Sequence, residues 1–123
     1  MTNPRHALGE RAELAAATWL EGRGWTILAR RWRCPDGELD LVARDPDGEL
    51  VGIEVKVRRT GRAGGPLESV DRQRLRRLRA ALARFRSEEP RSAAAGLRVD
   101  LVALRPDGRG QWRLSHHRGI DAW

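Results

Sequence analysis

Apolar residues recur along this chain with two different spacings, and each spacing predicts a type of element. From residue 7 to 21, the segment ALGERAELAAATWLE places apolar side chains three and four residues apart, as on one face of an α-helix. From residue 69 to 88, Leu75, Leu78, Leu82 and Phe85 repeat in the same way, and Asp71 is suited to cap the start. The sequence therefore predicts two amphipathic helices.

Shorter apolar runs rich in β-branched residues lie before, between and after these helices. They predict strands at 25–33, 38–44, 50–58, 97–105 and 111–117. The segment at about 60–68 is rich in glycine, and we expect it to be a mobile loop. Since no linker or change of composition divides the chain, we expect residues 1–123 to form a single domain.

The tripeptide Pro-Asp-Gly occurs three times, at 35–37, 46–48 and 106–108, each time between predicted strands. Its residues suit a type I turn followed by a left-handed glycine, so we predict three-residue hairpin loops. Counting back from the loop at 46–48 sets Asp40 directly opposite Glu54 on neighbouring antiparallel strands. Strand alternation then puts Lys56 on the same face.

These three residues form a candidate catalytic group. Two facing carboxylates need a positive partner, and together they suit Mg²⁺ or Mn²⁺, which bind oxygen ligands. Lys56 is the only lysine of the chain, and its amine can orient a water molecule or stabilise a phosphoryl oxygen. The alternative is a cross-strand charge cluster with a purely structural role.

The charge of the chain adds a candidate partner. Its net charge is +7, which favours a polyanion, with nucleic acid ahead of an anionic membrane surface. No apolar run has the length of a membrane span, the first residues contain no signal region, and Cys34 has no second cysteine to pair with. We therefore expect a cytoplasmic protein that has no membrane partner and no small-molecule cofactor.

With Asp40, the tripeptide Glu54-Val55-Lys56 resembles the core of the PD-(D/E)xK nuclease superfamily, which includes restriction endonucleases and archaeal Holliday-junction resolvases. Nearly the whole chain is similar to the YraN-like family of small bacterial proteins that are regarded as endonucleases. The matching motifs are Gly9-Glu10, Gly37-Glu38-Leu39-Asp40, Glu54-Val55-Lys56-Val57-Arg58 and Arg98-Val99-Asp100.

The resemblance implies an α/β fold with a restriction endonuclease-like αβββαβ core, in which helices flank a mixed sheet. It also implies that Asp40, Glu54, the Val55 carbonyl and Glu10 hold Mg²⁺ or Mn²⁺, and that Lys56 serves the attacking water. Helical spacing places Glu10 off the apolar stripe, so a solvated acid near the helix start is the alternative for that residue.

The family usually has a lysine in the first turn of the second helix, where this chain has Arg74. A guanidinium keeps the charge but not the geometry of an ammonium, so we expect Arg74 to contact phosphate. Other arginines near it invite the same interpretation, with a solvated charged face as the alternative. The candidate nucleic-acid ligands are Arg58, Arg59, Arg62, Arg72, Arg74 and Arg76.

Two further features point to structural roles. We expect Asp100 to satisfy arginine or backbone donors at the end of a strand. His116 and His117 are adjacent on a predicted strand and so face opposite sides, which favours a surface pair over a shared metal site.

The sequence thus predicts a metal-dependent endonuclease acting on DNA. We expect it to select branched, flapped or single-stranded forms, because arginines recognise backbone and shape and the chain leaves no room for a separate sequence-reading domain. One alternative is a non-catalytic nucleic-acid-binding adaptor with a nuclease-like fold, and another is an acidic protein bound to the second helix. The oligomeric state stays open, and a homodimer would allow both strands to be cut.

Overall fold

The computed structural model describes residues 4–58, 70–92 and 96–122. Its two long helices and five strands follow the predicted order, with a short 3₁₀ turn between the second helix and the fourth strand. The elements are α1 (Pro4–Glu21), β1 (Thr26–Cys34), β2 (Gly37–Arg44), β3 (Leu50–Val57), α2 (Arg72–Glu88), η2 (Pro90–Ser92), β4 (Leu97–Pro106) and β5 (Trp112–His117).

The five strands form one sheet in the sequential order β1-β2-β3-β4-β5. Neighbours are antiparallel except β3 and β4, which are parallel because α2 carries the chain back across the sheet between them. The predicted α/β class, with an αβββαβ order and a mixed sheet flanked by helices, is confirmed. β5 extends this core at the β4 edge.

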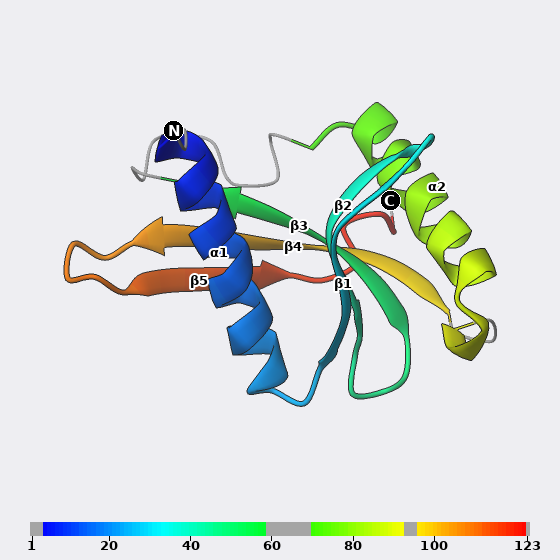
Figure 1. The fold of residues 1–123 in the computed structure, drawn as a ribbon, viewed down its shortest axis with the longest axis horizontal. Coiled ribbons are helices and arrows are strands. Elements are labelled where there is room, and N and C mark those ends of the chain that lie inside the picture. Colours follow the sequence, from blue (N-terminus) through cyan, green and yellow to red (C-terminus); the bar gives the residue numbers. More distant parts are fainter. Residues whose placement is uncertain (1–3, 59–69, 93–95, 123) are drawn as a thin grey trace.

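The two helices cover opposite faces of the sheet. Ala16 and Leu20 of α1 pack in one core cluster with Ile53 of β3, whereas Leu78 and Leu82 of α2 belong to a second cluster. β3 is buried on both faces, which explains why its first residues read as a continuous apolar run. Figure 1 shows α1 lying across one face and the β1–β2 hairpin curving towards α2.

The middle Pro-Asp-Gly forms the three-residue loop that we predicted. The Asp45 N–H donates to the Glu49 carbonyl at 3.0 Å, the Gly48 N–H donates to the Asp45 carbonyl at 3.0 Å, and Gly48 has a φ of +92°. The predictions for the other two copies were wrong. Cys34 pairs directly with Gly37, so Pro35 and Asp36 make a two-residue turn.

In the third copy the loop is shifted by two residues, because an aspartate side chain sets it. Asp107 Oδ1 accepts the N–H groups of Arg109 at 2.7 Å and Gln111 at 3.1 Å, and Gly108 and Gly110 both have a φ of +81°. Asp45 plays the same part in the middle loop, where its Oδ1 accepts two N–H groups at 2.9 Å. In both loops the turn is therefore set by the aspartate that directly follows the strand, and not by the proline of the tripeptide.

The β1–β2 hairpin changes direction at Arg31 and Asp40. Arg30 pairs with Leu41 and Trp32 with Leu39, so Arg31 and Asp40 lie opposite each other between these pairs. Leu39 and Leu41 belong to core clusters on opposite faces although they are two residues apart, so strand alternation breaks between them.

Two features accompany this break in strand alternation, one in the backbone and one at the tip of the hairpin. Arg31 has a φ of +51°, and no other non-glycine residue has a positive φ among those that the structure describes. Beyond the break, the tip of the hairpin lies over α2, where Asp36 binds Arg84 at 2.8 Å and the Trp32 ring packs edge-on against Phe85.

Candidate metal and nucleic-acid site

The register of β2 and β3 brings Asp40 and Glu54 together. The observed pairs run from Arg44–Leu50 to Leu41–Ile53, which is the register counted from the loop at 46–48. One further step along the ladder reaches Asp40 and Glu54, whose side chains share a hydrogen bond.

The break in the hairpin places the Asp40 carboxylate where a backbone partner would otherwise lie. Its Oδ2 accepts the Val55 N–H at 2.8 Å, just past the last β2–β3 pair. In a strand the N–H and carbonyl of one residue point to the same side, so the Val55 carbonyl is directed towards β2 as well. The carboxylates and this carbonyl are the oxygen donors that the sequence suggested.

The electrostatics of the pair are unusual for acids. Burial and the hydrogen bond and negative charge of Glu54 raise the pKa of Asp40 to about 8, against the opposing effect of the Val55 N–H. At neutral pH the Asp40 carboxyl group therefore carries a proton. A hard divalent cation can replace that proton and neutralise both groups.

Glu54 is held from the other side by α2. Its side chain is 3% exposed, and Arg74 places Nε at 2.6 Å and Nη2 at 2.5 Å from the same oxygen, Oε2. Arg74 occupies the first turn of α2, where its own N–H donates to the capping Asp71 at 2.8 Å. The guanidinium that we expected at a phosphate thus binds the site carboxylate.

Lys56 lies two residues after Glu54, so strand alternation puts both side chains on the same face of β3. It is half-buried, and it makes no ion pair or side-chain hydrogen bond within the described part of the chain. Arg58 follows directly after β3, and its N–H donates to the Leu104 carbonyl at 2.8 Å.

The acid of α1 that acts on Asp40 is Glu13, which the sequence analysis missed. Glu10 has a side chain that is 52% exposed, and it binds Arg31 at 3.2 Å. Glu13 is 16% exposed, binds Arg31 at 2.8 Å, and its charge contributes to the raised pKa of Asp40. Glu13 lies three residues before Ala16 and four before Ala17, both of which are buried. This helical spacing could have indicated that Glu13 faces the sheet.

The donor set matches a divalent cation held by two carboxylates. Among residues 4–58, 70–92 and 96–122, no group of three or more His, Cys, Asp or Glu side chains is arranged to hold a metal ion. Mg²⁺ and Mn²⁺ are often bound by one or two carboxylates together with waters and substrate phosphate. Asp40 and Glu54 fit that pattern, and Glu10 stands apart from them.

Other exposed arginines of α2 line a hollow that does not include Arg74. Arg72, Arg76 and Arg79 line an open hollow of about 500 Å³ together with Leu75 and Asp121. Of the predicted nucleic-acid ligands, Arg72 and Arg76 are exposed here, whereas Arg59, Arg62 and the glycine-rich loop at 60–68 lie outside the described residues.

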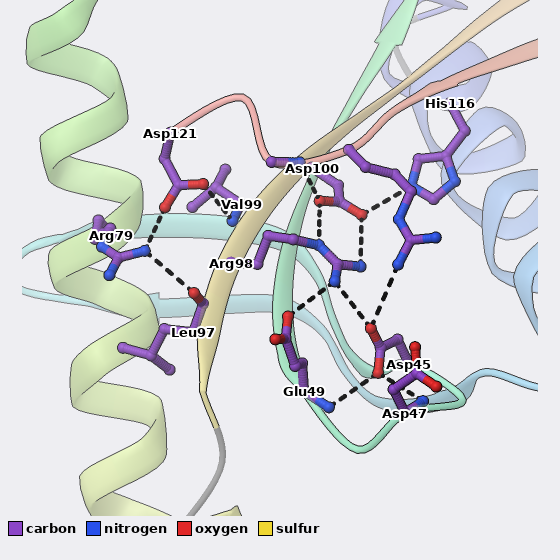
Figure 2. A network of polar contacts seen from close by, with 12 residues as sticks. Asp45, Asp47, Glu49, Arg79, Leu97, Arg98, Val99, Asp100, His116 and Asp121 are labelled. Carbon is purple, nitrogen blue, oxygen red and sulfur yellow. Dashed lines mark hydrogen bonds and ion pairs between the residues drawn. The ribbon is translucent and has the colours of Figure 1, made fainter. Parts of the chain in front are cut away.

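A second polar cluster is structural (Figure 2). Arg98 binds Asp45, Glu49 and Asp100, each with at least one contact at 2.9 Å, which confirms the expected arginine partner of Asp100, although Asp100 lies within β4 and not at its end. The expectation of a surface histidine pair was wrong for His116. Its ring is 13% exposed, because it packs edge-on against Trp19 and Trp25 while Nε2 lies 2.8 Å from Asp100.

The fold and the site define an α/β protein in which Asp40 of β2 meets Glu54 of the central strand β3, with Lys56 on the same strand. The sequence profile of the Uncharacterised protein family UPF0102 matches residues 12–104. A UPF0102 protein from Beutenbergia cavernae is 44% identical over 116 residues, which cover 94% of this chain and 97% of that protein. Another from Arthrobacter sp. is 46% identical over 114 residues, 92% and 94% of the two chains. The chain belongs to the UPF0102 family, which confirms the resemblance to the YraN-like proteins.

Two solved structures show weaker similarity. A chain of the EndoMS-dsDNA2 complex is 23% identical with a TM-score of 0.43, over 74% of this chain and 34% of that one. Pyrococcus furiosus SfsA in complex with Ca²⁺ is 14% identical with a TM-score of 0.47, over 89% and 64%. TM-scores this low indicate nothing about function. No helix in the described residues is long and apolar enough to cross a membrane.

Proposed function

We propose that this protein is a divalent-metal-dependent endonuclease that hydrolyses phosphodiester bonds of DNA. The observation that carries the proposal is the meeting of Asp40 and Glu54 at a break in the sheet, with the Asp40 pKa raised to about 8 and Lys56 on the Glu54 face of β3. A structural charge cluster would be expected to pair its lysine with the carboxylates, whereas Lys56 pairs with neither.

Asp40 and Glu54, with the Val55 carbonyl directed to the same side, would hold Mg²⁺ or Mn²⁺. Such an ion lowers the pKa of a bound water and neutralises charge on a phosphoryl oxygen. The Lys56 amine would donate hydrogen bonds to the attacking water or to a non-bridging phosphate oxygen. Arg72 and Arg76 would bind phosphates further along the DNA strand. Arg58, directly after β3, would lie near the site.

The substrate class follows from how arginines read nucleic acid. They contact the backbone, which carries shape and flexibility but no direct base sequence. We therefore propose branched, flapped or single-stranded DNA as the substrate.

The test is cleavage of labelled single-stranded, flap, fork, four-way-junction and duplex DNAs with Mg²⁺, Mn²⁺ or EDTA. Asp40→Asn and Lys56→Ala should each lower the rate at least about 100-fold, since each removes a group that acts in the transition state. Arg109→Ala, in the loop between β4 and β5, is the control and should cut like the native chain. Cleavage that persists in EDTA or in Asp40→Asn would refute the proposal.

One observation favours a second candidate function, a non-catalytic DNA-binding adaptor. Arg74 already neutralises Glu54, as an arginine would in a site that never binds metal. If the protein is an adaptor, the native protein, Asp40→Asn and Lys56→Ala should all bind the same DNAs equally well. None of the three should cut them.

A further inference from the structure

Arg74 of α2 binds a single oxygen of the Glu54 carboxylate, Oε2. Both Nε and Nη2 contact Oε2, at 2.6 and 2.5 Å, so one carboxylate oxygen receives two charged donors. Arg74 and Glu54 differ in how freely their side chains can move. Glu54 is 3% exposed and fixed within β3, whereas the Arg74 side chain is 45% exposed. If either partner moves, it is the guanidinium.

A divalent cation on the Asp40–Glu54 pair would compete with this guanidinium. Asp40 hydrogen-bonds to Glu54, so the two carboxylates and Arg74 share one small volume that already contains a positive charge. A cation bound there repels the guanidinium and draws electron density from the same carboxylate. Metal binding should therefore release Arg74 from Glu54.

The released side chain would remain at a place suited to phosphate. Arg74 is in the first turn of α2, where the carboxylate of Asp71 already caps the helix end, so the guanidinium and not the helix end would hold the phosphate. Arg72 and Arg76 are exposed too, but residues two apart on a helix do not face each other, so Arg74 would bind a phosphate of its own. A guanidinium matches a phosphate with two parallel hydrogen bonds, as it matches a carboxylate.

We propose that Arg74 is an exchangeable counter-ion, which leaves Glu54 for a DNA phosphate when the metal binds. This inference rests on the metal site proposed above. Because binding free energies are linked reciprocally, metal should tighten DNA binding and DNA should tighten metal binding by the same factor. The exchange would let the site bind its metal firmly only when a DNA strand is present to accept Arg74.

The first test measures Mn²⁺ alone, by electron paramagnetic resonance of free Mn²⁺, with no DNA present. Arg74→Gln removes the competing charge, so we expect Mn²⁺ to bind about 5–10-fold more tightly than to the native protein, a typical coupling factor. Arg72→Gln removes the same charge from the same turn without touching Glu54, and we expect its Mn²⁺ affinity to change less than about twofold. Weaker Mn²⁺ binding by Arg74→Gln would overturn the proposal, because Arg74 would then support the metal site.

The second test measures the affinity for a flap DNA with Ca²⁺ or with EDTA, under conditions where binding and cleavage are scored separately. The native protein should bind about 5–10-fold more tightly with Ca²⁺, and Arg74→Gln should lose this ratio. Arg72→Gln should bind DNA more weakly in both conditions and keep the ratio. A ratio that survives in Arg74→Gln would overturn the exchange even if the protein proves to be a nuclease.

Two further outcomes separate this proposal from the proposed function. If the native protein binds no Mn²⁺ in the presence or absence of DNA, both the metal site and the exchange are refuted. If Arg74→Gln fails to fold, as judged by circular dichroism, Arg74→Lys replaces it. A single ammonium makes fewer contacts with Glu54, so Mn²⁺ affinity should rise by a smaller factor while the DNA coupling persists. Unchanged Mn²⁺ affinity in Arg74→Lys would count against the exchange.

Discussion

Arg98 and Asp100 lie two residues apart on β4, and the guanidinium of the first holds the carboxylate of the second through Nε at 2.9 Å and Nη2 at 3.2 Å (Figure 2). Asp100 also accepts the Gly119 N–H at 2.8 Å, so this fully buried carboxylate joins β4 to the C-terminal segment. Although burial opposes the shift, hydrogen bonds from His116 and Arg98 hold the pKa of Asp100 below its ordinary value.

Removing Arg98 should therefore be costly. Arg98→Met leaves Asp45 and Asp100 buried without their common cation, and breaking a buried pair in this way costs about 3–5 kcal/mol. We expect that loss in the free energy of unfolding measured with urea at neutral pH. Arg91→Met, at a side chain that is 88% exposed, should stay within about 0.5 kcal/mol of the native protein. A loss below about 1 kcal/mol in Arg98→Met would show that the network contributes little.

The metal-free protein should lose stability as the pH rises from about 4 to about 8. In the folded state, burial and Glu54 raise the Asp40 pKa from 3.8 to about 8, so the folded protein binds one more proton than the unfolded chain in this window. The stabilisation from this extra proton is fully present below the Asp40 pKa of the unfolded chain and is lost as the pH rises through the Asp40 pKa of the folded protein. Within this window the free energy of unfolding should fall by at most about 1.4 kcal/mol per pH unit.

Asp40→Asn should flatten this slope, because the amide does not titrate. Glu88→Gln, which changes an exposed acid near the end of α2, should keep the native slope. Urea unfolding at several pH values between 5 and 9, in EDTA, makes the comparison. Equal slopes in native protein and Asp40→Asn would show that Asp40 titrates normally.

The sequence predicted the elements and the central pair of the site because both follow local rules. Apolar spacing indicated the helices and strands, and the loop at 46–48 fixed the register that sets Asp40 beside Glu54. That loop was predicted from its Pro-Asp-Gly composition, and in the structure Asp45 Oδ1 accepts the N–H groups of Asp47 and Glu49, contacts made within five residues.

The contacts that the sequence did not reveal depend on how distant elements pack. Arg74 reaches Glu54 only because α2 begins over the middle of β3, and no spacing along the chain encodes that position. The burial of His116 depends on tryptophans of α1 and of the turn after it. The break at Arg31 required a positive φ at a residue that rarely adopts one, so strand alternation gave no warning of it.

Two glycines should respond to alanine with opposite signs. A Cβ at Gly52 of β3 would lie 3.1 Å from Leu39 Cδ2 and 3.5 Å from Leu82 Cδ1, in a core where both leucines are fully buried. Overpacking of this kind costs about 1–3 kcal/mol. Gly9 lies within α1, where an added Cβ would meet no described atom within 4 Å, so Gly9→Ala should stabilise by about 0.5–1 kcal/mol.

Thermal and urea unfolding of the two variants test this pair directly. In Gly52→Ala, shortening the neighbour with Leu39→Val should recover part of the loss, so the double variant should be more stable than the sum of the single changes predicts. Additive effects would mean that the strain at Gly52 does not arise from Leu39.

DNA binding should depend on salt through the exposed arginines of α2. If Arg72 and Arg76 each contact one phosphate, replacing either with alanine should make the slope of log affinity against log salt concentration less steep by about 0.9. The loss of affinity should be similar for DNAs of different base sequence, because phosphate contacts do not read sequence.

Arg79 offers a contrast within the same hollow. It binds Asp121 and donates to the Leu97 carbonyl at 3.2 Å, so Arg79→Ala should lower the free energy of unfolding more than Arg72→Ala or Arg76→Ala does. Arg109→Ala should leave both the affinity and the salt slope as in the native protein. Equal changes of slope in Arg72→Ala, Arg76→Ala and Arg109→Ala would mean that the net charge of the chain, and not this face of α2, attracts the DNA.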